Sequence, residues 1–278
     1  MLDLQQEKLQ VAHTADPDDA FAWWAIANGH VSLNNYKIEL EALHIQDINE
    51  ACIDQKFDIA AVSSAAWPHL YKNYCILASG ASVGRGYGPV IASASAVDLN
   101  KDVTVAIPGE LTTGALLLRL FYPNVKTVSM PFDQIAEAIS LQHVDAGVLI
   151  HEELLNWQNK GLQKVQCLGK KWQDEMDLPI PVGLNIVHRR LGEDMKKVQQ
   201  VVCDSMQFAA KNEEKAKDWG RKYTIETKRG IAEKFMQMFA NEDTLRLQED
   251  CVRALHKLYE VAYAAKLIPC IPDVDIIW

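Results

Sequence analysis

The chain lacks the sequence features that mark metal, redox and membrane proteins. Its 6 cysteines are scattered and form no CxxC pair, so neither a zinc ribbon nor a thioredoxin-type motif is available. No apolar run approaches the roughly 20 residues that a membrane-spanning helix requires. The first residues, Met1 to Lys8, are polar and acidic, so we expect no secretory leader. We therefore expect a cytoplasmic protein with no metal site and no membrane partner.

Basic residues are also fewer than acidic ones. The 278 residues include 28 Lys and Arg against 37 Asp and Glu, which gives a net charge of -9. A general nucleic-acid or anionic-membrane binder is excluded, because both need a basic surface. Hydrophobic residues make up 49% of the chain, an ordinary share for a globular protein with one large domain or two smaller ones. The expected partner is therefore a small molecule, and a homodimer remains open.

Short β-like runs alternate with helical stretches over the first two-thirds of the chain. Asp16 and Pro17 supply an N-cap and a first-turn proline for an expected helix that runs to residue 27. Such alternation indicates parallel or mixed sheets covered by helices on both faces. From Leu191 to about residue 265 the pattern is helical. The expected strands are 9–13, 36–44, 58–62, 90–94, 103–107, 125–129, 145–150, 164–168 and 184–188.

The order of these elements predicts two α/β lobes. The chain leaves the first lobe at about residue 94 and regains it at about residue 188, with no flexible linker at either place. We expect residues 1–94 plus 189–278 to form a discontinuous first lobe and 95–188 a second lobe, with a ligand cleft between them. This is the α/β architecture of two-lobed periplasmic-binding-protein-like (type II) folds, with mixed sheets flanked by helices and a helical C-terminal region.

Small hydroxyl residues follow one expected strand in each lobe. Ser63 and Ser64 come after 58–62, while Thr112 and Thr113 come after 103–107. Backbone N–H groups and hydroxyls at such turns suit a carboxylate, and ligands of open α/β sheets bind at the carboxyl ends of the strands. Each pair also fits an ordinary helix N-cap. Because both lobes carry one, we expect the four residues to bind a small-molecule carboxylate substrate.

The glycine-rich segment 80–89 matches neither the dinucleotide motif GxGxxG nor a P-loop, so it supports no nucleotide cofactor. Glycines beside a hinge instead suit a loop that approaches the ligand closely or has positive φ angles. Arg85, within this segment, is a candidate partner for an acidic group of the substrate. It also fits a solvated loop charge.

His151 is the candidate catalytic residue. It ends the apolar run 146–150 and precedes a helix, whose N-terminus disfavours a protonated imidazole. A neutral histidine near pH 7 is a competent general base, although a hydrogen-bonded junction residue fits the position too. A zinc protease is excluded because position 155 is Leu, which breaks the HExxH motif. Asp19, at the end of the first strand, could orient a ligand or a basic group, or belong to a capping network.

Together these motifs make the chain resemble the 1,4-dihydroxy-6-naphthoate synthase family, from the futalosine route of menaquinone biosynthesis. The resemblance covers essentially the whole chain. It implies a cofactor-free lyase that cleaves cyclic dehypoxanthinyl futalosine, with His151 as the proton-abstracting base and with Ser63, Thr112 and Thr113 binding the substrate. The motifs are DPDDAF at 16–21, GRGYGP at 84–89, IPGELTT at 107–113, LIHE at 149–152 and LPIPVG at 178–183.

The chain departs from the family pattern at two places. The frequent Ser-Pro-Cys-Pro-Asn-Asp entry appears here as Thr-Ala-Asp-Pro-Asp-Asp at 14–19, and the common Lys two residues before the serine is Ala61. Ala61 removes a positive group expected near the substrate. Two alternatives therefore stay open: a paralogous enzyme, similar to chorismate dehydratase, that acts on another acidic substrate, and a solute-binding receptor for a small carboxylate.

Overall fold

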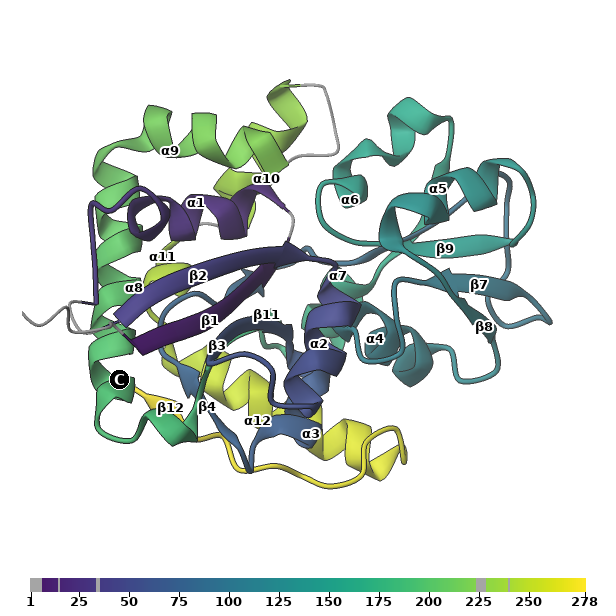
Figure 1. The fold of residues 1–278 in the computed structure, drawn as a ribbon. Coiled ribbons are helices and arrows are strands. Elements are labelled where there is room, and N and C mark those ends of the chain that lie inside the picture. The colour runs from purple at the N-terminus through teal and green to yellow at the C-terminus, as the bar shows by residue number, and fades with distance from the viewer. Residues whose placement is uncertain (1–6, 15, 34–35, 224–228, 240) are drawn as a thin grey trace, which may run out of the picture.

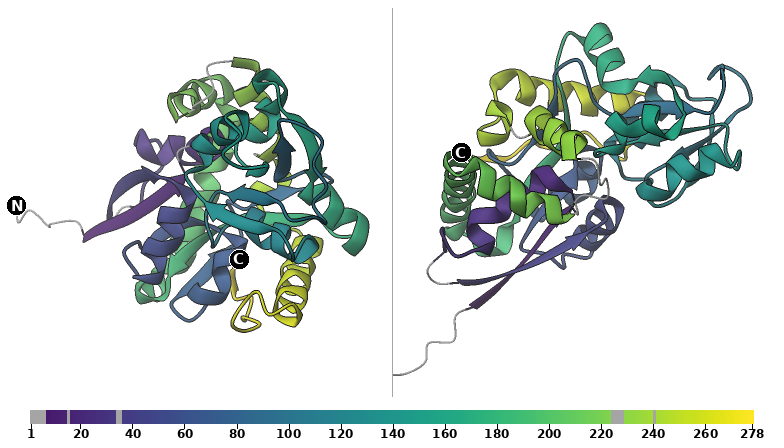
Figure 2. Two further views of the ribbon diagram at one scale, coloured as in Figure 1. Left: turned by 90° about the vertical axis from the view of Figure 1, so that its right-hand side faces the viewer. Right: turned by 90° about the horizontal axis from the view of Figure 1, so that it is seen from above.

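The structure is a computed structural model that describes residues 7–14, 16–33, 36–223, 229–239 and 241–278. These residues form two mixed β-sheets, one in each half of the molecule, with helices packed against the sheets (Figure 1). The view from above shows the second half projecting from the larger first half (Figure 2). No helix among the described residues is both long enough and apolar enough to cross a bilayer.

The sheet of the first half has the strand order β12-β4-β11-β3-β1-β2, with β5 pairing beside β11. Strand β1 runs parallel to β2 and β3, whereas β11 runs antiparallel to β3, β4 and β5. β3 is buried along its whole length, as its continuous apolar sequence predicts for a central strand. The strands are β1 (Glu7–Thr14), β2 (Tyr36–Leu43), β3 (Ile59–Ser63), β4 (Tyr74–Leu77), β5 (Ser82–Gly84), β11 (Ile180–His188) and β12 (Ile276–Ile277).

The sheet of the second half has the order β10-β6-β9-β7-β8. β7 is parallel to β8 and β9, while β6 is antiparallel to β9 and β10. The strands are β6 (Val90–Ser93), β7 (Thr104–Ile107), β8 (Lys126–Ser129), β9 (Ala146–Leu149) and β10 (Gln163–Cys167).

Helices cover both sheets, and the C-terminal region is helical as expected. Figure 1 shows α8 along the outer side of the first half and α12 beneath its sheet. The helices are α1 (Pro17–Ala27), α2 (Ile45–Ile53), α3 (Trp67–Leu70), α4 (Thr113–Phe121), α5 (Phe132–Ser140), α6 (Glu153–Asn156), α7 (Leu168–Met176), α8 (Asp194–Lys211), α9 (Glu213–Gly220), α10 (Arg229–Phe239), α11 (Glu242–Leu245) and α12 (Glu249–Ala264).

The sheets divide the chain earlier than the expected boundaries at residues 94 and 188. β6 pairs with β9 and β10, so it belongs to the second sheet rather than to the first lobe. β11 lies between β3 and β4, so it belongs to the first sheet rather than to the second lobe. The chain therefore crosses between the halves at 85–89, after β5, and again at 177–179, before β11.

The glycines of the first crossing permit tight backbone packing. Gly86 and Gly88 have φ angles of 78° and 157°. Opposite them, a Cβ atom on Gly169, at the start of α7, would lie 2.1 Å from the carbonyl oxygen of Tyr87. Only glycine allows so close an approach of two backbones. The glycine-rich segment therefore seats the crossing against α7.

The apolar core is continuous between the two halves. One cluster of buried side chains includes Val62 and Ile186 of the first sheet together with Val105 and Val148 of the second. Burying apolar surface contributes about 25 cal/mol per Å² to the free energy of folding, so a shared core stabilises the observed arrangement of the halves. The two lobes thus act as one folded unit with a cleft at their junction.

Candidate active site

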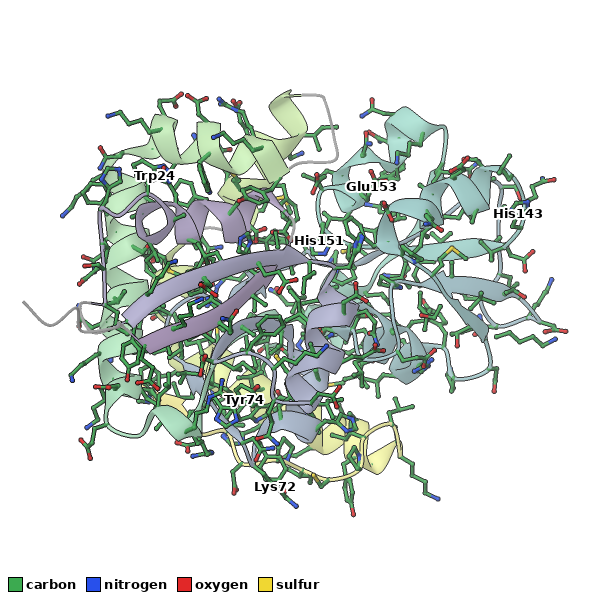
Figure 3. The ribbon with its side chains drawn as sticks, viewed as in Figure 1. Trp24, Lys72, Tyr74, His143, His151 and Glu153 are labelled. Carbon is green, nitrogen blue, oxygen red and sulfur yellow. The ribbon has the colours of Figure 1, made fainter. Side chains whose placement is uncertain are left out.

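The cleft lies between the two sheets and encloses about 660 Å³, part of it open to solvent. Figure 3 shows His151 at the junction of the two halves, whereas His143 lies at the far edge of the second half. Ala61 and Ser63 line the cleft from the first sheet, and Thr113 and His151 line it from the second half. The carboxyl ends of the strands in both halves therefore face one space, as the sequence predicts.

One side of the cleft, which we call the hydroxyl side, is formed by Ser63, Thr112 and Thr113. Thr112 caps α4: its Oγ1 atom donates to the Gly109 carbonyl at 2.8 Å and accepts from the Ala115 N–H at 3.3 Å. The hydroxyl of Thr112 is thus used inside the fold. At the start of any helix the first backbone N–H groups have no acceptor within the helix, and Thr113 and Gly114, at the start of α4, both line the cleft.

Thr113 joins the two halves. Its Oγ1 atom donates to the Val182 carbonyl of β11 at 2.7 Å and accepts from the Ala65 N–H at 3.2 Å. Both partners belong to the first half, while Thr113 begins α4 of the second. The side chain is buried, with 2% of its surface exposed. Thr113 therefore fastens the cleft at its hydroxyl side.

The two serines differ in their access to the cleft. Ser63 lines it, accepts a hydrogen bond from Asn49 Nδ2 at 3.1 Å, and keeps its own hydroxyl proton available for a ligand. The side chain of Ser64 is fully buried, and its Oγ atom has no hydrogen-bond partner among the described residues. The structure thus places Ser63 in the cleft and Ser64 behind it.

The opposite side, which we call the acid side, carries Asp16, Asp18 and Asp19 at the start of α1. Asp19 Oδ2 accepts from the Thr14 N–H at 3.0 Å and from Thr14 Oγ1 at 2.5 Å. Asp16 is the N-cap, and its Oδ1 atom accepts from the Asp19 N–H at 3.3 Å. Ser82 Oγ donates to Asp18 Oδ2 at 3.3 Å. Asp19 therefore belongs to a capping network while it also lines the cleft.

His151 meets the acid side across the cleft. Its Nδ1 atom contacts Asp16 Oδ2, although the two residues come from different halves of the molecule. The imidazole also packs edge-on against Phe132 of α5, with ring centroids 4.6 Å apart. His151 has a φ angle of 51°, a left-handed conformation that a residue with a Cβ rarely adopts. Such strain is held only where the surroundings fix it, and it is frequent at functional sites.

Burial raises the pKa of two carboxyl groups on the acid side and lowers the pKa of His151. Desolvation lowers the pKa of His151, against the raising effects of Glu152, Asp18 and Asp19. Desolvation, and then the neighbouring Asp19 charge, raise the pKa of Asp16 to about 7. Desolvation and the Asp16 charge also raise the pKa of Asp18 well above its usual value. Among the described residues that line the cleft, none is Lys or Arg.

Arg85 lies outside the cleft. Its guanidinium binds Asp243 at 2.8 Å and Asp250 at 2.7 Å, which ties the first crossing to α11 and α12. The hydrogen bonds to Asp243, followed by those to Asp250, raise the pKa of Arg85. The guanidinium is thus committed to two carboxylates of the protein, which corrects its expected placement beside the substrate.

The described residues include two groups in which three potential metal ligands lie within 4.8 Å of one another. One is Asp243, Asp250 and Cys251, where Arg85 already supplies a cation. The other is the acid side itself, whose carboxyl groups bind hydroxyls, backbone N–H groups and His151. Protein donors thus bind carboxylate oxygens in both groups, although Asp18 Oδ1 has no hydrogen-bond partner among the described residues.

Asp16 is the functional candidate that the sequence reasoning overlooked. The Asp16-Pro17 pair indicates a helix cap, and the cap is indeed present. The signal that could have revealed more is positional: Asp16 follows β1 and His151 follows β9, each at the carboxyl end of its strand. Two lobes that close on one cleft bring such ends together.

Comparison with known proteins gives results for nearly the whole chain. A family described as "Menaquinone biosynthesis" matches residues 9–264. A protein of Streptomyces coelicolor named 1,4-dihydroxy-6-naphthoate synthase is 30% identical, over 97% of this chain and 98% of its own length. A Thermus thermophilus protein of the same name is 27% identical, over 94% of this chain and 96% of its own length.

Solved structures show the same fold. A crystal structure of an Archaeoglobus fulgidus protein superposes with a TM-score of 0.88 at 36% identity, over 95% of this chain and 100% of that one. A Candida albicans protein described as having the generic periplasmic binding protein fold superposes with a TM-score of 0.72 at 12% identity, over 96% of this chain and 92% of that one. The expected periplasmic-binding-protein-like fold is therefore confirmed.

Proposed function

Because the chain belongs to the menaquinone biosynthesis family, we propose that it is the carbon–carbon lyase that converts cyclic dehypoxanthinyl futalosine into 1,4-dihydroxy-6-naphthoate. The observation that carries this proposal is His151, whose imidazole is mostly shielded from solvent and contacts Asp16 across the cleft. A base placed between two closing lobes meets a bound substrate without competition from bulk water.

In the proposed reaction, His151 removes a proton from the substrate. The pair of electrons of the broken bond stays on the substrate and drives cleavage of the carbon–carbon bond, while the proton passes to the imidazole. Burial favours the neutral imidazole at the start, because desolvation lowers the pKa of His151. A neutral imidazole is the protonation state that a general base requires.

The hydroxyl side is the proposed anchor for the substrate's carboxylate. The Ser63 hydroxyl and the N–H groups of Thr113 and Gly114 supply the donors, and the N-terminus of α4 favours negative charge. The acid side would repel that carboxylate, so the substrate is oriented with its carboxylate away from Asp16 and its reacting carbon near His151. Phe235 and Phe239 offer apolar surface in the cleft for its aromatic ring.

The direct test is incubation of the purified protein with cyclic dehypoxanthinyl futalosine, followed by chromatographic detection of the naphthoate. His151→Gln keeps a polar side chain of similar size and removes the base, so we expect a loss of kcat of about 10³-fold. Circular dichroism of the variant checks that the fold is kept. No product from the wild-type protein, or an undiminished rate of the variant, contradicts the proposal. Binding without turnover by the wild-type protein would indicate a carboxylate receptor.

One observation favours a second candidate function, a related reaction on another acidic substrate. Ala61 lines the cleft at the position where the resembled family commonly carries Lys, and no described cleft residue replaces that charge. A substrate that does not depend on a positive group at this position would suit such a cleft better. The same assay, run with a panel of acidic cyclic substrates that includes chorismate, separates the two candidates by their kcat/KM values.

A further inference from the structure

We propose that Asp16 is the positioning residue of His151: it accepts the Nδ1 proton of the imidazole across the cleft and so leaves Nε2 as the atom that takes the proton from the substrate. The contact joins the two halves, so the base depends on how the halves are placed relative to each other. This inference deepens the proposed lyase function and rests on it for the identity of the substrate.

The geometry fixes both partners. Asp16 is held from its other oxygen by the Asp19 N–H, at the first turn of α1. His151 is held by its left-handed backbone after β9 and by the ring of Phe132. The side chains of Asp16 and His151 are 4% and 12% exposed. Turning either side chain away would break these contacts, so they favour the Nδ1 contact between the two residues.

Counting protons shows which form of the pair is active. With Asp16 ionised and His151 neutral, the single imidazole proton sits on Nδ1 and points at the carboxylate, and Nε2 carries a lone pair. One further proton gives either an imidazolium with a carboxylate or a neutral imidazole with a carboxylic acid. In the imidazolium, and in the neutral imidazole whose Nδ1 accepts a hydrogen bond from the carboxylic acid, Nε2 bears a proton and cannot act as a base. The active form therefore exists only above the pKa at which the pair loses this proton.

The surroundings favour the charge that develops during the reaction. The titratable groups that face the pair are Asp18 and Asp19 on α1 and Glu152 beside His151 itself, and each of these carboxyl groups raises the pKa of His151. When Nε2 takes the substrate's proton, the new imidazolium keeps its Nδ1–H bond to Asp16 and is stabilised by this negative field. A pair enclosed by acids thus suits a base that must become a cation.

A purely structural role for Asp16, as the cap of α1, makes a different prediction. Asn and Asp are about equally good N-caps, so Asp16→Asn preserves the cap while it removes the ionisable carboxylate. In this variant we expect kcat to fall about 100-fold, with KM within about 3-fold of the wild-type value. Asp16→Glu, which restores the charge on a longer side chain, should recover part of kcat.

The pH profile is the readout that a cap alone would not move. The pKa of Asp16 is raised to about 7, so we expect wild-type kcat/KM to rise as the pH increases through about 7, where the pair loses its extra proton. In Asp16→Asn the imidazole no longer shares a proton with residue 16, and desolvation lowers its pKa, so the rise should move to lower pH. The control is Asp58→Asn, another buried aspartate that instead binds the Gln10 N–H and Arg190. The Asp58→Asn variant should show the same pH dependence of kcat/KM as the wild-type protein.

A measurement without substrate keeps this proposal separate from the proposed function. Nitrogen-15 NMR of the histidine rings, with His151→Gln to assign the signal, should show the Nδ1–H form of neutral His151 at pH 8 and its loss or weakening in Asp16→Asn. An Nε2–H form in the wild-type protein, or an unchanged signal in the variant, overturns the proposal. If the NMR result is as expected but no naphthoate forms, the lyase assignment fails and the pair stands.

Discussion

The hydroxyl side and the acid side of the cleft hold their polar groups in opposite ways. On the hydroxyl side, the Thr112 and Thr113 hydroxyls both donate and accept hydrogen bonds within the protein. On the acid side, three carboxyl groups crowd together, and burial raises the pKa of Asp16 and of Asp18. The first arrangement stabilises the closed fold, whereas the second is poorly stabilised in its charged form.

This difference separates two tasks that one cleft must perform. Satisfied hydrogen bonds give a rigid wall on which a substrate can be oriented. The hydroxyl groups that form them do not titrate near neutral pH. Crowded acids around an imidazole give a group that takes up and releases a proton near pH 7. Substitutions on the two sides should therefore differ in kind: loss of stability and closure on the first, a change of pH dependence on the second.

The largest stability effect is expected for Thr113→Val. Valine keeps the shape of the side chain but leaves the Val182 carbonyl and the Ala65 N–H without the Thr113 hydroxyl. Two buried polar groups that lose their partner cost about 2–4 kcal/mol in the free energy of unfolding. Because both bonds join the halves, KM for the substrate should rise as well. Urea unfolding followed by circular dichroism measures the first effect.

The matched control is Thr127→Val on β8. The Thr127 hydroxyl accepts a hydrogen bond from Arg119 at 3.2 Å within the second half, and no bond joins it to the described residues of the first half. The Thr127→Val substitution should change the free energy of unfolding by no more than about 0.5 kcal/mol. Equal losses in the two threonine variants would mean that the bonds of Thr113 between the halves have no special weight.

The acid side predicts a gain of stability from Asp18→Asn. A carboxyl group whose pKa is raised on folding binds its proton more tightly in the folded state, so its contribution to stability falls as the pH rises from its unfolded pKa through its folded pKa. Asparagine has no proton to lose. A gain of about 1 kcal/mol at pH 8 would raise Tm by about 2–4 °C, and the gain should vanish near pH 4.

Asp98→Asn provides the control of opposite sign. Hydrogen bonds from the N–H and the side chain of Asn100 lower the pKa of this exposed carboxyl group. Its ionised form therefore favours the folded state, and its removal should not raise Tm at pH 8. Calorimetry of both variants at pH 4 and pH 8 measures the contrast. A fall in Tm for Asp18→Asn at pH 8 would show that the Asp18 carboxylate is stabilised after all.

Local signals in the sequence predict most of the fold. Apolar alternation and capping residues give β1, α1, β3 and β7 close to their observed bounds. The strands β5 and β12 were not predicted, because three and two residues are too few to show a period. The four-residue strand β4 was not predicted either. The sheet to which β6 and β11 belong could not be predicted either, since strand pairing is a contact between distant residues.

The same reasoning divides the site. The strand-end positions of Ser63, Thr113 and His151 are local features, and each lines the cleft. The contacts of Arg85 and Asp16 could not be predicted, because their partners lie far away in the chain. Arg85 meets Asp243, 158 positions later, and Asp16 meets a histidine of the other half. A charged side chain alone does not show which of many distant groups it will bind.

The smallest effect is expected for Arg85→Lys, and it tests whether this residue serves either side of the cleft. Lysine keeps a positive charge beside Asp243 but cannot form the paired hydrogen bonds that Arg85 makes to two carboxylates. The Arg85 side chain is 42% exposed, so solvent screening limits the cost to about 1 kcal/mol or less. Because Arg85 lies outside the cleft, kcat and KM should stay within about 2-fold of wild type. A KM raised about 10-fold would instead mean that Arg85 binds the substrate's carboxylate, since loss of a paired hydrogen bond to a charged group has that size.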